Sequence, residues 1–462
     1  MLSVPYFSRV WIIQEVAVAS DFALLWGDIT ITKQEFRKFR LAALYYKLSD
    51  VDVEKGSPGV LWNPVALLFM GHYKVGGDSL LHLLSSTLST NATDARDKIF
   101  ALIGLAGSRS YGIVPDYSRS EAEVFSGLAR SVIVAESNLD ILDHSYVEDP
   151  EDPERRPLWA PRWHADDDSH KHYLINYHFT ASRDGPVVLV PSRNEKVLSL
   201  RGIQVDSIRD MCDRGTELHQ DIPAVFDMIT RNMEVFRKGY DSDIIRTILL
   251  TMMAGHESSG PMINNVITRL TNDGYINNFI SFALQFKIHS HISQDGGEPE
   301  QRRYLELVRL AANTISLPAE PCWTSSEDFE FLEMMLNTLY PHDLSAVAAD
   351  LDMLSRIDCD FVMGPQRFED LIQASHGSKM FLTETGYVGF GPRCMRPGDV
   401  VCVLFGGGTP YVVRPTGVAD EYYLFLGPAY VQGLMDGEAI DAWEKGKQNE
   451  NQEIQEKLFK LL

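Results

Sequence analysis

RVWIIQE at residues 9–15 places polar and charged groups among large apolar side chains, and TDARDKIFALIG at residues 93–104 does the same. On a helix, Trp11, Gln14 and Glu15 lie at positions i, i+3 and i+4, so an amide and a carboxylate share the face that should be buried. Burying such groups costs free energy unless they find partners. The first helix is therefore predicted to meet another charged segment.

The second stretch offers those charged partners. We predict that the helix bearing Trp11 docks against the segment that holds Arg96 and Asp97, so that acidic and basic side chains satisfy each other away from solvent. This docking is the central structural prediction from the sequence.

Glu15 has two interpretations. A carboxylate on an apolar helical face has either a raised pKa or a bound cation, and either condition could serve acid–base chemistry. The favoured interpretation is a structural ion pair, because buried ion-pair networks perturb pKa values without reacting. The candidate cations are Arg9, Arg96 and Lys98.

A further carboxylate follows the second stretch. Asp116 and Tyr117 come directly after Pro115, and an aspartate in such a turn accepts hydrogen bonds from nearby backbone N–H groups. Helix capping and salt bridges suit the charged residues before it. We therefore assign a structural role to a set of motif residues: Arg9, Trp11, Gln14, Arg96, Asp97, Asp116 and Tyr117.

The chain resembles the fungal heterokaryon incompatibility (HET) family, which carries an RxWxxQE motif followed by a TDxRDK motif and a PDYS motif, the last at residues 115–118 here. Similar pieces follow at residues 158–163, 198–208 and 385–438. The family's LSYxWG and WIDxxCINQ stretches, which normally precede the first motif, are absent from this sequence. The family has been likened to Toll/interleukin-receptor (TIR) domains, so the resemblance implies the second half of an α/β domain.

The expected fold class is α+β. A partial α/β, TIR-like HET domain precedes a small antiparallel β domain that is built from two segments around a helical insertion. The segment at 143–157 is acidic and contains three prolines, which is typical of a solvated linker. The predicted parts are 1–142 for the HET-like domain, 143–157 for the linker, 158–210 with 379–440 for the β domain, 211–378 for the insertion, and 441–462 for a C-terminal helix or tail.

Several local elements are also predicted. A helix should cover residues 5–18, and Gly27-Asp28 has the chemistry of a two-residue hairpin. Thr32 with Glu35 and Ser120 with Glu123 match capping boxes, each of which predicts a helix start. Further helices are expected near 78–88 and from Thr93 to Gly104 or Gly107. Short β-branched runs predict strands at 187–190, 197–200, 400–404, 411–413 and 422–426.

The formal net charge of −22 would repel a phosphate backbone, so nucleic acid is not an expected partner. No apolar run is long enough to span a membrane, and the start lacks the pattern of a cleaved signal. Five scattered cysteines without C-x-x-C spacing fit free thiols in the cytoplasm. His164, His170, His172 and His178 lie in a polar loop, so we expect no metal there.

Three functions are compared. As the resemblance implies, the favoured one is non-self recognition and cell-death signalling through protein contacts, with allelic or non-self proteins as partners and no cofactor. The second is a TIR-like enzyme that hydrolyses a nucleotide (NAD) with Glu15, which is the less favoured because fold likeness does not fix function. The third is a truncated or inactive paralogue. The oligomeric state is left open.

Overall fold

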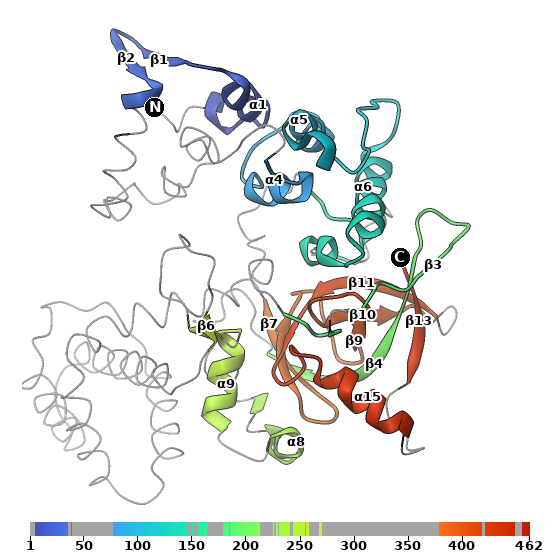
Figure 1. The fold of residues 1–462 in the computed structure, drawn as a ribbon. Helices are drawn as coiled ribbons and strands as arrows, with labels where there is room; N and C mark the ends of the chain where they lie inside the picture. Colours follow the sequence, from blue (N-terminus) through green and yellow to red (C-terminus); the bar gives the residue numbers. More distant parts are fainter. Residues whose placement is uncertain are drawn as a thin grey trace, which may run out of the picture. The chain divides into compact units, whose positions relative to one another are not determined.

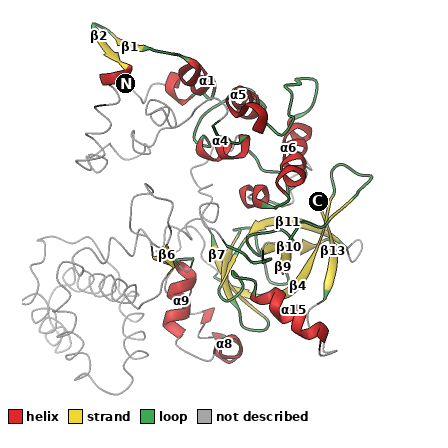
Figure 2. Cartoon of the chain, viewed as in Figure 1, coloured by secondary structure: helices red, strands yellow, loops and turns green. Residues whose placement is uncertain are grey.

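A computed structural model describes residues 5–35, 77–145, 156–163, 179–183, 185–212, 231–240, 244–254, 378–417, 421–448 and 455–462, with a few single residues or pairs between them. The chain divides into two compact units. The first comprises Met1–Val205, Asp399–Pro428 and Asp436–Leu462, and the second comprises Asp206–Gly398 and Ala429–Met435. Figure 1 traces the elements along the sequence, and Figure 2 distinguishes helices from strands.

The first unit begins with a broken helix and a hairpin. The single helix predicted for residues 5–18 is instead a 3-10 turn, η1 (Pro5–Ser8), followed by α1 (Trp11–Val18). Strands β1 (Ala23–Trp26) and β2 (Ile29–Thr32) pair antiparallel around Gly27-Asp28, as predicted. Gly27 has a φ of +57°, which a residue without a Cβ adopts at no steric cost.

The described helices that follow in the same unit are α4 (Leu80–Ser86), α5 (Asp97–Ala106), the 3-10 helix η4 (Gly107–Arg109), α6 (Glu121–Glu136) and the 3-10 helix η5 (Asp140–His144). The Ser120–Glu123 capping box is confirmed, since both of its reciprocal hydrogen bonds are present at the start of α6. Helix α5 ends at Gly107, which has a φ of +58°, so Gly104 lies inside the helix and does not terminate it.

A small barrel completes the first unit. Its strands are β4 (Leu198–Met211), β9 (Val400–Leu404), β10 (Tyr411–Pro415), β11 (Tyr422–Pro428) and β13 (Glu456–Leu461). They hydrogen-bond in the order β4-β13-β11-β10-β9, and β9 pairs again with β4, so the five strands close into a ring. A short strand, β3 (Leu189–Val190), pairs with β4 from outside this ring.

The barrel corrects two predictions from the sequence. The sheet is mixed and not purely antiparallel, because β13 runs parallel to β11. The predicted C-terminal helix or tail at 441–462 is only partly helical: α15 (Glu438–Gln448) is a helix, whereas the last residues form β13 inside the barrel. The local pattern at residues 458–461 predicted a marginal amphipathic helix because the strands that pair with this segment, β4 and β11, are distant in the sequence.

The predicted linker is also corrected at its start. His144 and Ser145 are buried, and the Ser145 hydroxyl donates to the Trp159 carbonyl oxygen at 2.7 Å. One apolar cluster joins helices α1, α4, α5 and α6 to Trp159, Trp163 and the barrel interior. The helical part of the first unit and the barrel therefore share a core at this point of the chain.

The second unit contains the far end of β4, which pairs with β7 (Lys379–Thr383). Strand β8 (Val388–Gly391) pairs with β7 and with β12 (Tyr430–Val431). Of the predicted helical insertion, the structure describes α8 (Met233–Gly239), α9 (Ile244–Met252) and a pair of two-residue strands, β5 (His256–Glu257) and β6 (Thr268–Arg269). The rest of 211–378 lies almost entirely outside the described residues.

The coarse fold class is confirmed as α+β with a mixed sheet. Within the described residues 5–145, the strands are confined to the β1–β2 hairpin. In the parts of the chain that are described, no helix is both long and apolar enough to cross a bilayer.

Candidate functional site

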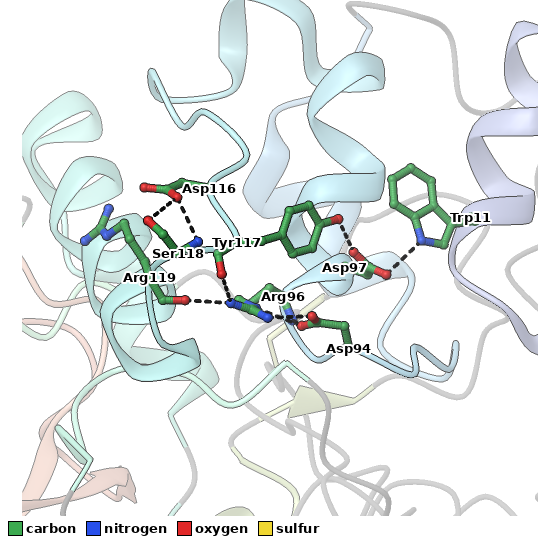
Figure 3. A network of polar contacts seen from close by, with 8 residues as sticks. All are labelled: Trp11, Asp94, Arg96, Asp97, Asp116, Tyr117, Ser118 and Arg119. Carbon is green, nitrogen blue, oxygen red and sulfur yellow. Dashed lines mark hydrogen bonds and ion pairs between the residues drawn. The ribbon is translucent and has the colours of Figure 1, made fainter.

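Asp97, the first residue of α5, joins all three sequence motifs. Its Oδ2 accepts a hydrogen bond from the Trp11 indole N–H at 3.0 Å, and its Oδ1 accepts one from the Tyr117 hydroxyl at 2.6 Å. Figure 3 shows the carboxylate between the two aromatic side chains. The hydrogen bond to Asp97 is the largest cause that raises the pKa of Tyr117 to about 12, because the carboxylate stabilises the protonated phenol. The Trp11 helix therefore docks on this segment as predicted, but through the indole N–H and not through the predicted pairing of acidic and basic side chains.

Arg96, the neighbour of Asp97, holds the loop that follows α5. Its guanidinium binds both carboxylate oxygens of Asp94, at 2.9 and 2.6 Å, and donates to the carbonyl oxygens of Tyr117 and Arg119 at 2.8 and 2.7 Å. It also lies 5.2 Å from the centre of the Tyr117 ring. Hydrogen bonds from Arg96 hold the pKa of Asp94 below its ordinary value. A single side chain therefore fixes a loop backbone at two points.

Asp116 shapes the same loop from within. Its Oδ1 accepts hydrogen bonds from the Ser118 backbone N–H at 2.9 Å and from the Ser118 hydroxyl at 2.6 Å, which is the turn geometry predicted from the sequence. These bonds lower the pKa of Asp116, with the hydroxyl contributing most. Asp97 binds the Tyr117 hydroxyl and Asp116 binds Ser118, so the two carboxylates act on different residues of the loop (Figure 3).

Lys98, a candidate partner of Glu15 by its position in the sequence, is buried and binds backbone carbonyl groups instead. Its ammonium donates to the carbonyl oxygens of Thr87, Leu88 and Thr90 at 3.2, 2.9 and 2.6 Å, and it contacts the Thr90 hydroxyl at 3.1 Å. Burial lowers the pKa of Lys98 to about 8. The lysine therefore binds the carbonyl groups of the turn that follows α4, which gives its buried ammonium the acceptors that it needs.

Glu15 lies on the exposed side of α1, so the expectation that it shares the buried face is wrong. It accepts a hydrogen bond from the Tyr6 hydroxyl at 3.2 Å. The helix turns so that Ile12 and Ile13 are buried and Trp11 is half-buried, which leaves the carboxylate toward solvent. A catalytic role for Glu15 stays a prediction that the structure does not test.

Gln14 and Arg9, the other two motif residues of the stretch 9–15, act through side-chain packing and through the backbone, respectively. A Cβ at Gly104 would come within 2.7 Å of the Gln14 side-chain nitrogen, so the missing side chain leaves room for this amide against α5. Arg9 has an exposed side chain, and its backbone forms a bridge with Asn91. Arg9 therefore positions the chain ahead of α1 without entering the Asp97 cluster.

Chemically, this arrangement is a set of charge-assisted hydrogen bonds around Asp97 and Arg96. Within the described residues, no group of three or more His, Cys, Asp or Glu side chains gathers as metal ligands would. His164, His170, His172 and His178 lie outside the described residues. Reactive chemistry needs a nucleophile or base that is free to act, whereas both oxygens of Asp97 accept hydrogen bonds within the fold.

Sequence reasoning missed two features of the site. The Tyr117 hydroxyl was assigned only to a turn, and no local pattern predicts a bond to a residue 20 positions earlier. Lys98 could have been recognised as buried, because it stands in the apolar run that continues as Ile99-Phe100-Ala101. A lysine in such a run requires acceptors that follow its side chain into the core.

Comparisons with known proteins agree with the motifs. Residues 326–448 match the Het-6 beta-barrel domain family. The chain is 26% identical to heterokaryon incompatibility protein 6, OR allele, of Neurospora crassa over 482 aligned positions, which cover 95% of this chain and 65% of that protein. A shorter match, 29% identical over 90 residues, is to the DNA repair protein RecO of Bacillus subtilis and covers 18% of this chain and 35% of RecO. No solved structure matches the chain. The resemblance to the heterokaryon incompatibility family is confirmed.

Proposed function

From its similarity to heterokaryon incompatibility proteins, we propose that this chain takes part in a non-self response by binding another protein, with cell-death signalling as the outcome. The partner that we propose is an allelic or non-self protein determinant. A cytoplasmic location belongs to the same proposal. The chain spans 65% of the length of the Neurospora relative. The partner, the outcome and the location are therefore proposals for this chain.

One observation carries the proposal: the loop from Gly112 to Arg119 is exposed and yet held firmly. The exposed fraction of Val114 is 75% and that of Tyr117 is 52%. Arg96 donates hydrogen bonds to two backbone carbonyl oxygens of this loop. The Tyr117 ring packs edge-on against the Phe100 ring, with 5.1 Å between the ring centres. A loop that is already ordered loses little conformational entropy on binding, which favours a contact surface.

The first experiment tests this loop. The chain is expressed in a fungal host, and viability is compared between the wild type and Val114→Asp. We expect the wild type to impair growth and the substitution to restore it, because a carboxylate at the centre of an apolar contact is costly to desolvate. Val134→Asp on α6 is the matched control, since Val134 is 67% exposed and lies outside the loop. Equal growth of the wild type and Val114→Asp would contradict the proposal.

The same assay separates the enzymatic alternative. Glu15→Gln keeps the shape of the side chain and removes its charge, and cellular dinucleotide levels are measured together with viability. The contact proposal expects unchanged dinucleotide levels and undiminished growth impairment. Dinucleotide loss in the wild type that disappears in Glu15→Gln would favour the TIR-like hydrolase instead.

A further inference from the structure

A second acidic side chain, remote from the Asp97 cluster, lies where the helical part of the first unit meets its barrel. Asp143 belongs to η5 and is half-buried. The Thr409 hydroxyl, just ahead of β10, donates to its Oδ1 at 3.0 Å. Close by, the backbone N–H of Leu139 donates to the Gly406 carbonyl oxygen at 2.9 Å. Asp143 is thus part of the attachment between η5 and the barrel.

This carboxyl has acidic and hydroxyl neighbours instead of a cation. Helix α6 and strand β11 pack against η5, and Thr409 precedes β10. The titratable and charged groups of these elements are Asp140 and His144 of η5, Glu121, Glu123, Arg130 and Glu136 of α6, Tyr411 and Arg414 of β10, and Tyr422 and Tyr423 of β11. Among the described residues, no basic side chain forms an ion pair with Asp143; Asp140 repels its charge, and the Thr409 hydrogen bond only partly offsets burial. Burial, reinforced by Asp140, raises the pKa of Asp143 to about 8.

We propose that Asp143, as a neutral carboxylic acid, is a latch that ties η5 to the barrel, and that its ionisation in mildly alkaline solution loosens this attachment. The neutral acid accepts from Thr409 and has a proton of its own to donate. The buried Tyr411 hydroxyl lies beside it, and no described group satisfies that hydroxyl with ordinary hydrogen-bond geometry. An ionised Asp143 would be a partly desolvated charge without a countercharge, which disfavours the closed arrangement.

The sign of the pH dependence follows from the two pKa values. An aspartate has a pKa of 3.8 when it is exposed in the unfolded chain, and Asp143 has one of about 8 in the folded protein. Between these values the folded state keeps a proton that the unfolded state has lost. The contribution of Asp143 to stability is therefore full below pH 4, falls as the pH rises to about 8, and is constant above that.

Urea unfolding of the whole chain at pH 5 to 9 tests the latch, with Asp143→Asn compared to the wild type. Asparagine keeps the hydrogen-bonding shape and cannot ionise. We expect the ratio of folded to unfolded protein to fall in the wild type by up to about tenfold more per pH unit than in Asp143→Asn, up to pH 8. Asp28→Asn, at an exposed aspartate of the β1–β2 hairpin that does not act on Asp143, should keep the wild-type slope. Identical pH slopes in the wild type and Asp143→Asn would overturn the proposal.

Two measurements on the wild type stand even if the asparagine variant does not fold. Infrared spectroscopy at pH 7 should show the carbonyl band of a protonated carboxylic acid, which disappears as the pH passes about 8. Hydrogen exchange at the Leu139 amide should accelerate over the same range, because this N–H is bonded to the barrel carbonyl of Gly406. Absence of the carboxylic acid band at pH 7 would overturn the latch.

Discussion

At the scale of single residues, Asp97 shows why widely separated motif residues occur together. Trp11 and Tyr117 are more than a hundred positions apart, yet each donates a hydrogen bond to one oxygen of this carboxylate. Its position at the start of α5 adds a favourable interaction with the helix dipole. One half-buried side chain therefore positions both α1 and the exposed loop.

The hydrogen bond from Trp11 can be measured directly. Trp11→Phe retains most of the apolar contact and removes the indole N–H, so we expect it to lower the free energy of unfolding by about 1 kcal/mol. In an Asp97→Ala background, the same substitution should cost almost nothing further, because the acceptor is gone. Denaturant unfolding of the four variants gives both numbers. An equal loss in both backgrounds would show that the indole acts by packing alone.

At the scale of elements, the barrel closes at a glycine. A Cβ at Gly202 of β4 would lie 2.5 Å from the Val403 carbonyl oxygen and 2.8 Å from the Leu404 Cα of β9. Both atoms belong to the backbone, so a rotamer change cannot relieve the contact. Only a residue without a side chain lets β4 and β9 approach closely enough to pair.

Gly202→Ala should therefore force the two strands apart. We expect a loss of about 1 to 3 kcal/mol in the free energy of unfolding, the usual cost of overpacking a core, measured by urea denaturation. Gly127→Ala in α6 is the control, because its nearest neighbour is the flexible end of Arg119 at 3.3 Å and alanine favours a helix. A Gly202→Ala protein as stable as the wild type would mean that β9 shifts without cost.

At the scale of the whole molecule, the last strand completes a barrel that begins more than 250 residues earlier. Residues of β13 pair with β4 in a register that runs from Glu456–Ile203 to Leu461–Leu198, and with β11 on the other side. Phe459 and Leu461 are buried in the shared core. The C-terminal end therefore contributes to the stability of the first unit.

Removal of residues 455–462 should open the barrel. The deletion exposes the edges of β4 and β11 and removes two buried apolar side chains, each worth about 2 to 5 kcal/mol, so we expect cooperative thermal unfolding of the first unit to be lost. Hydrogen exchange should accelerate in β4, β10 and β11. Glu456→Gln, which removes only the exposed ion pair with Arg201, should change stability by less than about 1 kcal/mol. Wild-type protection in the deletion protein would contradict the closed ring.

The sequence by itself determined many of the local elements and carried the resemblance to the heterokaryon incompatibility family. Local interactions between residues a few positions apart form the capping boxes, the Gly27-Asp28 hairpin and the β-branched strands. A short stretch of sequence therefore predicts them. The polar groups in the first two motifs correctly predicted that α1 and α5 meet. The TIR-like detail and the domain limits stay predictions.

Only the tertiary structure decided where the charged groups lie. Glu15 is exposed, whereas His144 and Ser145 at the start of the predicted linker are buried, the reverse of what helical spacing and linker composition predicted. The parallel pairing of β13 was likewise invisible in the sequence, since its partners come from distant segments. Burial and register depend on which surfaces meet across the fold, and a local pattern carries no information about the partner on the other side.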